Sequence, residues 1–269
     1  MLKLLAASLL AASSPAVAMA NDNPFGYSND TGITKKGEYE VQQSVTMRSG
    51  LDQGSGFDRG YRGYDFQTQL EWGISDVDHL DFQVGETCLR SPAFKGFRFD
   101  GLNVEYKHLI RDGDKGGWGA AWVAALGYSQ LDSSSGALRT EIRYAGRLLL
   151  QNEFGARRAW CYVTNLSAGL AHNAIETVGQ VEWSQGIAYR PDDHWAYGVE
   201  TVADGTWTRF RNFDNSSLRV GPTLAYKTGD VSVSLTYLWQ LSGAPATDNG
   251  RNLADTCRSE GRLLLSFGF

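Results

Sequence analysis

Cysteine, proline and methionine are scarce in this chain, with three, six and three among 269 residues. The cysteines, Cys88, Cys161 and Cys257, are widely separated and lack the paired spacing of a zinc site, so we expect no metal and no cofactor. At most one disulfide can form between three cysteines. Two alternatives stay open for Cys88 and Cys257: a disulfide that joins two loops, or two separate thiols.

Long hydrophobic runs and an excess of positive charge are also missing. No segment beyond the first twenty residues approaches 18 consecutive apolar residues, which excludes a helical membrane protein. The net charge of −5 indicates no nucleic-acid partner. The chain is rich in glycine and 12% aromatic, a composition that fits a membrane β-barrel, whose alternating strands have a soluble-looking mean hydropathy.

The first twenty residues have the pattern of a secretory signal peptide. Lys3 supplies the positive charge, residues 4–12 form a short apolar stretch, and Ala18 and Ala20 mark a small-x-small cleavage site. The apolar stretch is too short for a spanning helix. We therefore predict a cleaved signal peptide over 1–20, a periplasmic N-terminal segment over 21–35 and an outer-membrane barrel over 36–269.

Alternation of apolar and polar residues dominates the rest of the chain. Such a period of two is typical of strands with one apolar face. We predict an all-β fold, a transmembrane antiparallel up-and-down β-barrel of about twelve strands. The alternating runs cover residues 38–48, 64–74, 79–86, 101–110, 117–129, 138–151, 158–171, 179–190, 195–203, 217–227, 231–241 and 260–269.

The connections between these runs alternate between short and long. Bacterial outer-membrane barrels have short periplasmic turns and longer outer loops, so we expect an outer-membrane location with both termini in the periplasm. Two of the long connections, 204–216 and 242–259, are long enough to contain strand extensions. The short ones are 75–78, 111–116, 152–157, 191–194 and 228–230; the long ones are 49–63, 87–100, 130–137, 172–178, 204–216 and 242–259.

The apolar face should contact lipid and the polar face should line the lumen. A mixed set of charges on the polar face indicates either an open channel with a transverse field or a closed, salt-bridged interior. The small residues of the fifth run, such as Gly119 and Ala121, leave room for a solute or for an inward-folded loop. The pore-lining candidates are Glu40, Asp65, Glu71, Asp81, Glu105, Lys107, Arg139, Glu141, Arg143, Glu182, Glu200, Arg219 and Arg262.

Motifs at both ends of the chain carry a family resemblance. The stretch 23–27 reads NPFGY, 36–43 reads KGEYEVQQ, and the last strand ends on Phe267 and Phe269. These motifs and the hairpin over 71–82 resemble an uncharacterised group of Gram-negative outer-membrane β-barrels that includes porin-like transporters. The resemblance implies that Phe267 and Phe269 form an assembly signal read by the barrel-assembly machinery. The other expected partner is outer-membrane lipid.

Three functions are compatible with such a barrel. A catalytic site would need a nucleophile beside a base. Of the four histidines only His172 lies beside a long loop, and no serine is paired with it by register, so we do not expect an enzyme. We expect a passive, porin-like channel for small polar or aromatic solutes, as a monomer rather than a trimer. The alternatives are a closed interaction barrel whose outer loops carry the function and, less favoured, a lipase- or protease-type enzyme.

Overall fold

The computed structural model describes residues 23–52, 61–90, 95–113, 117–132, 134–209 and 212–269. The predicted signal peptide lies outside these residues. Twelve strands make up most of the chain, and no described helix is long and apolar enough to cross a membrane. The strands are β1 (Tyr39–Ser49), β2 (Arg62–Gly73), β3 (Asp78–Arg90), β4 (Lys95–Arg111), β5 (Trp118–Leu131), β6 (Leu138–Phe154), β7 (Trp160–Asn173), β8 (Thr177–Tyr189), β9 (Trp195–Thr208), β10 (Asn212–Thr228), β11 (Val231–Ala244) and β12 (Ser259–Gly268).

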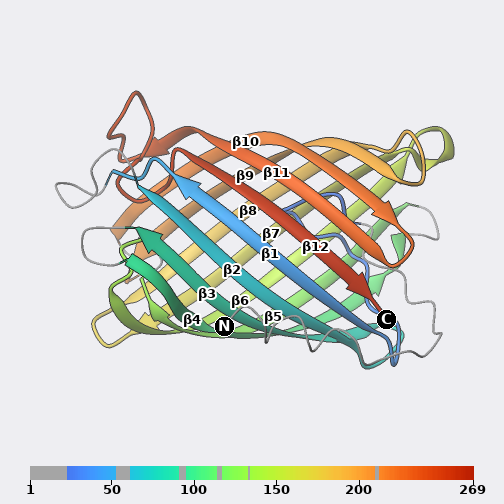
Figure 1. Ribbon diagram of the computed structural model, residues 1–269, viewed down its shortest axis with the longest axis horizontal. Coiled ribbons are helices and arrows are strands. Elements are labelled where there is room, and N and C mark those ends of the chain that lie inside the picture. Colours follow the sequence, from blue (N-terminus) through green and yellow to red (C-terminus); the bar gives the residue numbers. More distant parts are fainter. Residues whose placement is uncertain (1–22, 53–60, 91–94, 114–116, 133, 210–211) are drawn as a thin grey trace.

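The strands form one closed antiparallel barrel, as predicted (Figure 1). Each strand pairs with its neighbour in sequence, and β1 closes the ring against β12, with Val45 opposite Leu263. A membrane-spanning sheet needs a partner for every backbone polar group. Closure provides this, because it leaves no open sheet edge. The backbone of Phe269 exchanges two hydrogen bonds with Tyr39, so the last residue of the chain seals the first strand.

The apolar side chains face outward and the polar ones face inward. On β9, for example, Val199 is 47% exposed while the neighbouring Glu200 is fully buried. On β5, Leu126 is 53% exposed while Ser129 is 4% exposed. This is the inverse of a water-soluble barrel and suits a wall in contact with lipid.

Aromatic side chains gather on the outer face near the end of the barrel that carries Phe269. We call this the terminal end, and the opposite one the loop end. Tyr39 stacks on Phe269, and Trp195 contacts Tyr226 at 4.7 Å between ring centroids. A second group, with Tyr237 and Trp239 in edge contact, lies nearer the loop end. Two such belts are typical of barrels that meet two membrane interfaces.

The alternation of connection lengths is weaker than the sequence predicted. The expected long loop over 204–216 is wrong, because β9 continues to Thr208 and β10 begins at Asn212. The expected loop over 87–100 is likewise mostly strand, since β3 ends at Arg90 and β4 begins at Lys95. The long connections that remain are 50–61 and 245–258, both at the loop end.

Of the two readings of Cys88 and Cys257, the structure favours separate thiols, because both are free cysteines. Cys257 packs inside the barrel against Leu51, Tyr61 and Leu89. Cys88 precedes the buried Leu89 on β3 and therefore points to the opposite face of the wall. The alternative of a loop-to-loop disulfide is not formed in this structure.

Candidate functional site in the barrel lumen

The lumen holds the N-terminal part of the chain. The sequence led us to expect residues 21–35 outside the barrel as a periplasmic segment, but from residue 23 onward this segment runs through the lumen before it enters β1 (Figure 1). We call residues 23–35 the inner segment. Its sequence has no strand or helix periodicity, so its backbone polar groups need partners on the surrounding wall.

Glu200 of β9 is the main acceptor for the inner segment. Its two carboxylate oxygens accept hydrogen bonds from the backbone N–H groups of Gly26, Tyr27 and Ser28, at 2.8 to 3.1 Å. The hydroxyl of Thr236 on β11 also donates to this carboxylate, at 2.7 Å. A buried carboxylate with four donors is well satisfied, and bonds to a charged acceptor are the stronger kind.

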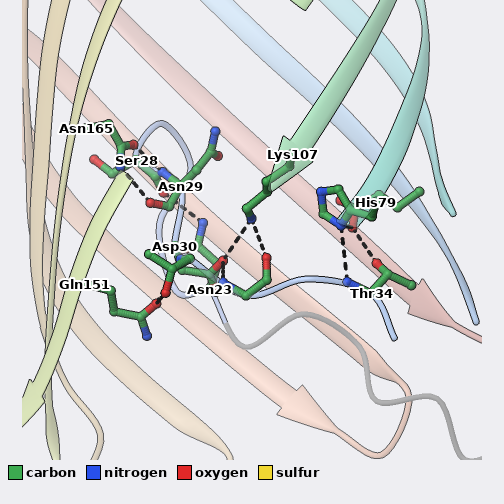
Figure 2. Close-up of polar contacts among 12 residues, drawn as sticks. Asn23, Ser28, Asn29, Asp30, Thr34, His79, Lys107, Gln151 and Asn165 are labelled. Atoms are coloured by element: carbon green, nitrogen blue, oxygen red, sulfur yellow. Dashed lines mark hydrogen bonds and ion pairs between the residues drawn. The ribbon is translucent and has the colours of Figure 1, made fainter. Parts of the chain in front are cut away.

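Polar side chains on other strands bind the rest of the inner segment (Figure 2). Asn29 exchanges two hydrogen bonds with Asn165 of β7, at 2.6 and 2.8 Å. Thr31 donates its N–H and its hydroxyl to Gln151 of β6. Lys107 of β4 donates to the Gly32 carbonyl and lies 3.8 Å from the Asp30 carboxylate. Thr34 donates to His79 and to Glu71, which lie on β3 and β2.

Apolar and aromatic contacts complete this packing. Phe25 is buried against Cys161, Val163 and Ala188 on the inner wall. The guanidinium of Arg262 lies 4.1 Å from the centroid of the Tyr27 ring. The inner segment is therefore attached to most strands around the ring.

Two inward-facing glycines make space for the inner segment. A Cβ added at Gly186 would lie 2.5 Å from the ring of Phe25, and one added at Gly119 would lie 2.6 Å from the hydroxyl of Thr31. Of the two uses the sequence left open for the small face around Gly119, the structure shows the second, a chain segment folded inward. The segment is the N-terminal one rather than a loop between strands.

Four acidic residues lie in one row across β1 to β4. Glu40 is paired with Glu71, Glu71 with Asp81, and Asp81 with Glu105 at directly opposite positions of adjacent strands. We call these four residues the acid row. Like charges at opposite positions destabilise a sheet, so this part of the lumen is strongly acidic.

Basic residues lie on other parts of the wall. Arg219 of β10 binds Glu260 at 2.7 Å and Asp204 at 2.9 Å. Arg143 of β6 binds Glu141 at 2.7 Å, and Arg139 of the same strand lies 3.7 Å from it. Each pore-lining candidate thus lies on the inward face of its strand, although several are bound to one another or to the inner segment. The inward residues are Glu40, Asp65, Glu71, Asp81, Glu105, Lys107, Arg139, Glu141, Arg143, Glu182, Glu200, Arg219 and Arg262.

The inner segment does not fill the described lumen, and cavities remain beside it. One of about 370 Å³ lies against it and is lined by Tyr27, His79 and Lys107. A second of about 310 Å³ lies beside Asn103 and Arg143, and a third of about 360 Å³ is lined by residues that include Cys257. Each is large enough for several water molecules or one small solute.

Sequence reasoning missed the inner segment and several lumen residues, among them His79, Asp204 and Glu260. His79 directly follows the short connection 75–78 in the sequence, but it is 2% exposed and points into the lumen next to Asp81. Its position could have been deduced from the hairpin around 74–77, which sets the pairing of β2 with β3. No comparable signal marks the inner segment.

The remaining histidines make local contacts. His172 Nδ1 lies 2.8 Å from the hydroxyl of Thr177, and His194 Nδ1 lies 2.9 Å from the carbonyl of Lys227. His108 binds Asp78 on the outer face of the wall. Within the described residues, these three histidines bind an aspartate, a threonine and a backbone carbonyl, and none of these contacts is the serine–histidine pair of a catalytic triad.

Solved outer-membrane proteins share this architecture. The crystal structure of the COG4313 outer membrane channel from Pseudomonas putida F1 matches with a TM-score of 0.58 at 9% identity, over 93% of this chain and 100% of the other. The NanC porin matches with a TM-score of 0.52 at 12% identity, over 84% and 98% of the two chains. LpxR from Salmonella typhimurium matches with a TM-score of 0.50 at 11% identity, over 86% and 100%.

Identities this low show a shared fold and nothing about activity. The search of curated proteins found no match. A family model, described as a family of unknown function (DUF6662), matches residues 17–269. This match covers the inner segment and the whole barrel, and the chain therefore belongs to the DUF6662 family.

Proposed function

We propose that this protein is a passive outer-membrane channel for small polar solutes, shown here with its inner segment filling part of the lumen. The main support for this proposal is the charged interior. The acid row on β1 to β4 shares the lumen with Arg147 on β6 and Arg262 on β12. Opposed charges across a lumen create a transverse field, which favours small hydrophilic or zwitterionic solutes. Two of the solved barrels with this fold are named as a channel and a porin.

Passage requires displacement of the inner segment, because it crosses the lumen and binds opposite walls. Its contacts are mainly hydrogen bonds to polar side chains, and only Phe25 belongs to a hydrophobic cluster. Hydrogen bonds of this kind exchange with water at a modest net cost of about 0.5–1.5 kcal/mol each. Polar attachment therefore suits a segment that leaves and re-enters the lumen.

The proposal includes an orientation in the outer membrane. The terminal end would face the periplasm, and the long connections over 50–61 and 245–258 would face outward. Phe267 and Phe269 would serve as the assembly signal, consistent with the position of Phe269 at the seam between β12 and β1. A monomer is proposed because the barrel closes on its own strands.

A closed interaction barrel is the second candidate, and the density of contacts around the inner segment favours it. Glu200 alone accepts four hydrogen bonds, three of them from the inner segment. If that segment never leaves, the long connections at the loop end would carry the function.

Liposome swelling separates the two candidates. Refolded mature protein is placed in vesicles, which are diluted into isotonic solutions of a zwitterionic amino acid, an aromatic carboxylate or a neutral disaccharide. The channel proposal predicts swelling with the amino acid faster than in protein-free vesicles, and slower swelling with the disaccharide. Rates equal to those of protein-free vesicles for every solute would contradict it and favour the closed barrel.

A further inference from the structure

Three side chains with metal-binding atoms meet on the inner wall beside the inner segment. Glu71 comes from β2, and His79 and Asp81 come from β3. One nitrogen or oxygen atom from each lies within 4.8 Å of the other two, and all three residues are buried. The set combines one imidazole with two carboxylates, which is a donor set used by divalent transition metals in proteins.

Glu71 and Asp81 belong to the acid row, and Lys107 of β4 lies opposite His79, but the cations near the cluster bind other groups. Lys107 lies 3.8 Å from Asp30, and Arg147 lies 3.7 Å from Glu105, so the nearby cations are paired with other acids. Within the described chain, no lysine or arginine forms an ion pair with Glu71 or Asp81. Two buried carboxylates at opposite positions of paired strands favour the binding of a cation between them.

Two atoms of the cluster lack hydrogen-bond partners. His79 Nε2 and Asp81 Oδ1 are buried, and neither has a partner in the described structure. The other carboxylate oxygen of Asp81 lies 3.6 Å from His79 Nε2, too far for a good hydrogen bond. Buried polar atoms in native proteins are nearly always paired, so an unpaired nitrogen beside an unpaired oxygen indicates a missing ligand.

Solvent reaches this cluster through the lumen. Glu71, His79 and Asp81 all line the cavity of about 370 Å³ that adjoins the inner segment. This volume accommodates a metal ion with several water ligands, since one water occupies about 30 Å³. The same cavity is lined mainly by polar side chains that can bind such waters, including Gln69 and Gln83.

We propose that Glu71, His79 and Asp81 bind one divalent transition-metal ion such as Zn²⁺. The ligand atoms are His79 Nε2 and one oxygen of each carboxylate. The nitrogen ligand favours Zn²⁺ over Mg²⁺ or Ca²⁺, which prefer oxygen ligands. The bound ion supplies the positive charge that the acid row lacks and satisfies both unpaired atoms. We infer this site without reference to solute passage.

Metal binding also competes with the inner segment for His79. In the structure, the backbone N–H of Thr34 donates to His79 Nδ1 at 3.2 Å (Figure 2). A neutral imidazole that binds metal through Nε2 carries its proton on Nδ1, which then cannot accept this hydrogen bond. The ion and the Thr34 amide therefore exclude each other at this ring, and metal binding loosens the inner segment where it approaches β1.

Isothermal titration of the refolded mature barrel with ZnCl₂ in detergent tests the site. Wild-type protein should bind one ion, and Asp81→Asn, which keeps the shape of the side chain, should weaken binding by about tenfold or more. His79→Gln should do the same, and heat-modified mobility in gels checks that each variant is folded. The matched control is His194→Ala, which removes an exposed histidine and should leave the affinity unchanged.

Three results would overturn the metal site: no binding to folded wild-type protein, equal affinity in Asp81→Asn, or loss of binding in His194→Ala. Because binding is measured without a membrane, a silent channel leaves the result intact, and a conducting channel that binds no Zn²⁺ refutes only this inference.

The competition is tested at Thr34. Thr34→Pro removes the backbone donor and should raise Zn²⁺ affinity above that of Thr34→Val, which keeps the donor and also removes the hydroxyl. Equal affinities in the two variants would refute the competition while leaving the site itself in place.

Discussion

Ser28 and Glu200 lie 172 residues apart in sequence and are joined by a hydrogen bond of 2.8 Å between the Ser28 N–H and the Glu200 carboxylate. The same carboxylate accepts the N–H groups of Gly26 and Tyr27. One buried side chain of β9 thus holds three consecutive residues of the inner segment in the lumen. Loss of the Glu200 carboxylate should therefore destabilise the bound inner segment more than the barrel, because backbone hydrogen bonds hold the strands together.

Glu200→Gln should favour the displaced state of the inner segment. The amide keeps the size of the side chain but loses the charge and one acceptor, and a hydrogen bond to a charged group is worth roughly 1.5–3 kcal/mol. We expect the fraction of time spent in the higher-conductance state to rise by about tenfold or more, measured in planar bilayers. Glu141→Gln is the control, because Glu141 binds Arg139 and Arg143 and not the segment. An equal change in both variants would contradict the role of Glu200.

Gly186→Ala should push the inner segment away from the wall without any change of charge. The new Cβ would lie 2.5 Å from the ring of Phe25, which is closer than carbon atoms approach. Gly146→Ala is the matched control, because a Cβ added there would have only the Val123 carbonyl oxygen nearby, at 4.0 Å. We expect increased protease cleavage of the N-terminal segment in Gly186→Ala only. If both variants resist cleavage like the wild type, the close packing of Phe25 is not what holds the segment.

Cys161 is a built-in reporter of the inner segment. It is fully buried under Phe25. In a background with Cys88→Ser and Cys257→Ser, a water-soluble maleimide should label Cys161 slowly, and Phe25→Ala should increase the rate by roughly tenfold or more, because the cover is removed. The measurement is the mass shift with time. Fast labelling in the parent background would mean that the segment already leaves the lumen freely.

The Cys257 thiol should lose its proton only at unusually high pH. Burial, and next the nearby Glu260 carboxylate, raise the pKa of this thiol to about 12. The reactive thiolate is therefore scarce until the pH approaches 12, well above the ordinary thiol range near 8.5. With Cys88→Ser and Cys161→Ser in place, iodoacetamide labelling of Cys257 should stay slow at pH 9 and increase only at higher pH. A labelling midpoint near pH 8.5 would contradict the burial of this loop residue.

Charge reversal at Arg139 and Arg143 tests the transverse field. Both arginines point into the lumen and share Glu141. In a conducting barrel, Arg139→Glu with Arg143→Glu should shift the reversal potential in a salt gradient toward cation selectivity, because the lumen loses positive charge. The comparison is Arg258→Glu, on the connection at the loop end. A change in thermal stability alone would remove support for the channel.

Much of the fold could be predicted from the sequence, because each barrel strand is marked by the alternation of apolar and polar residues. Residues such as Val199 and Glu200 alternate between lipid and lumen, and the turns mark where strands reverse. The sequence allowed for strand extensions beyond Ala203 but did not locate them, because side chains near the mouth contact water on both faces and lose the alternation. The same alternation indicates which charged residues share a face of each strand.

The inner segment could not be predicted in this way. Residues 23–34 have no periodicity, and their partners, such as Gln151 and Glu200, lie more than a hundred positions away. The cluster of Glu71, His79 and Asp81 was within reach, since the short hairpin turn determines which residues of β2 and β3 are opposite one another. A list of single charged residues does not show this cluster, because the cluster forms only when β2 and β3 are paired.

The most direct test is the single-channel conductance of the wild-type barrel beside a variant in which residues 24–33 are replaced by glycine and serine. The account predicts small or rare current steps for the wild type and larger, long-lived steps for the variant, because the replacement cannot fill the lumen or bind Glu200. Gel mobility with and without heating confirms that both barrels are folded. Equal conductance of the two proteins, whether both silent or both open, would contradict a channel that its own N-terminal segment closes.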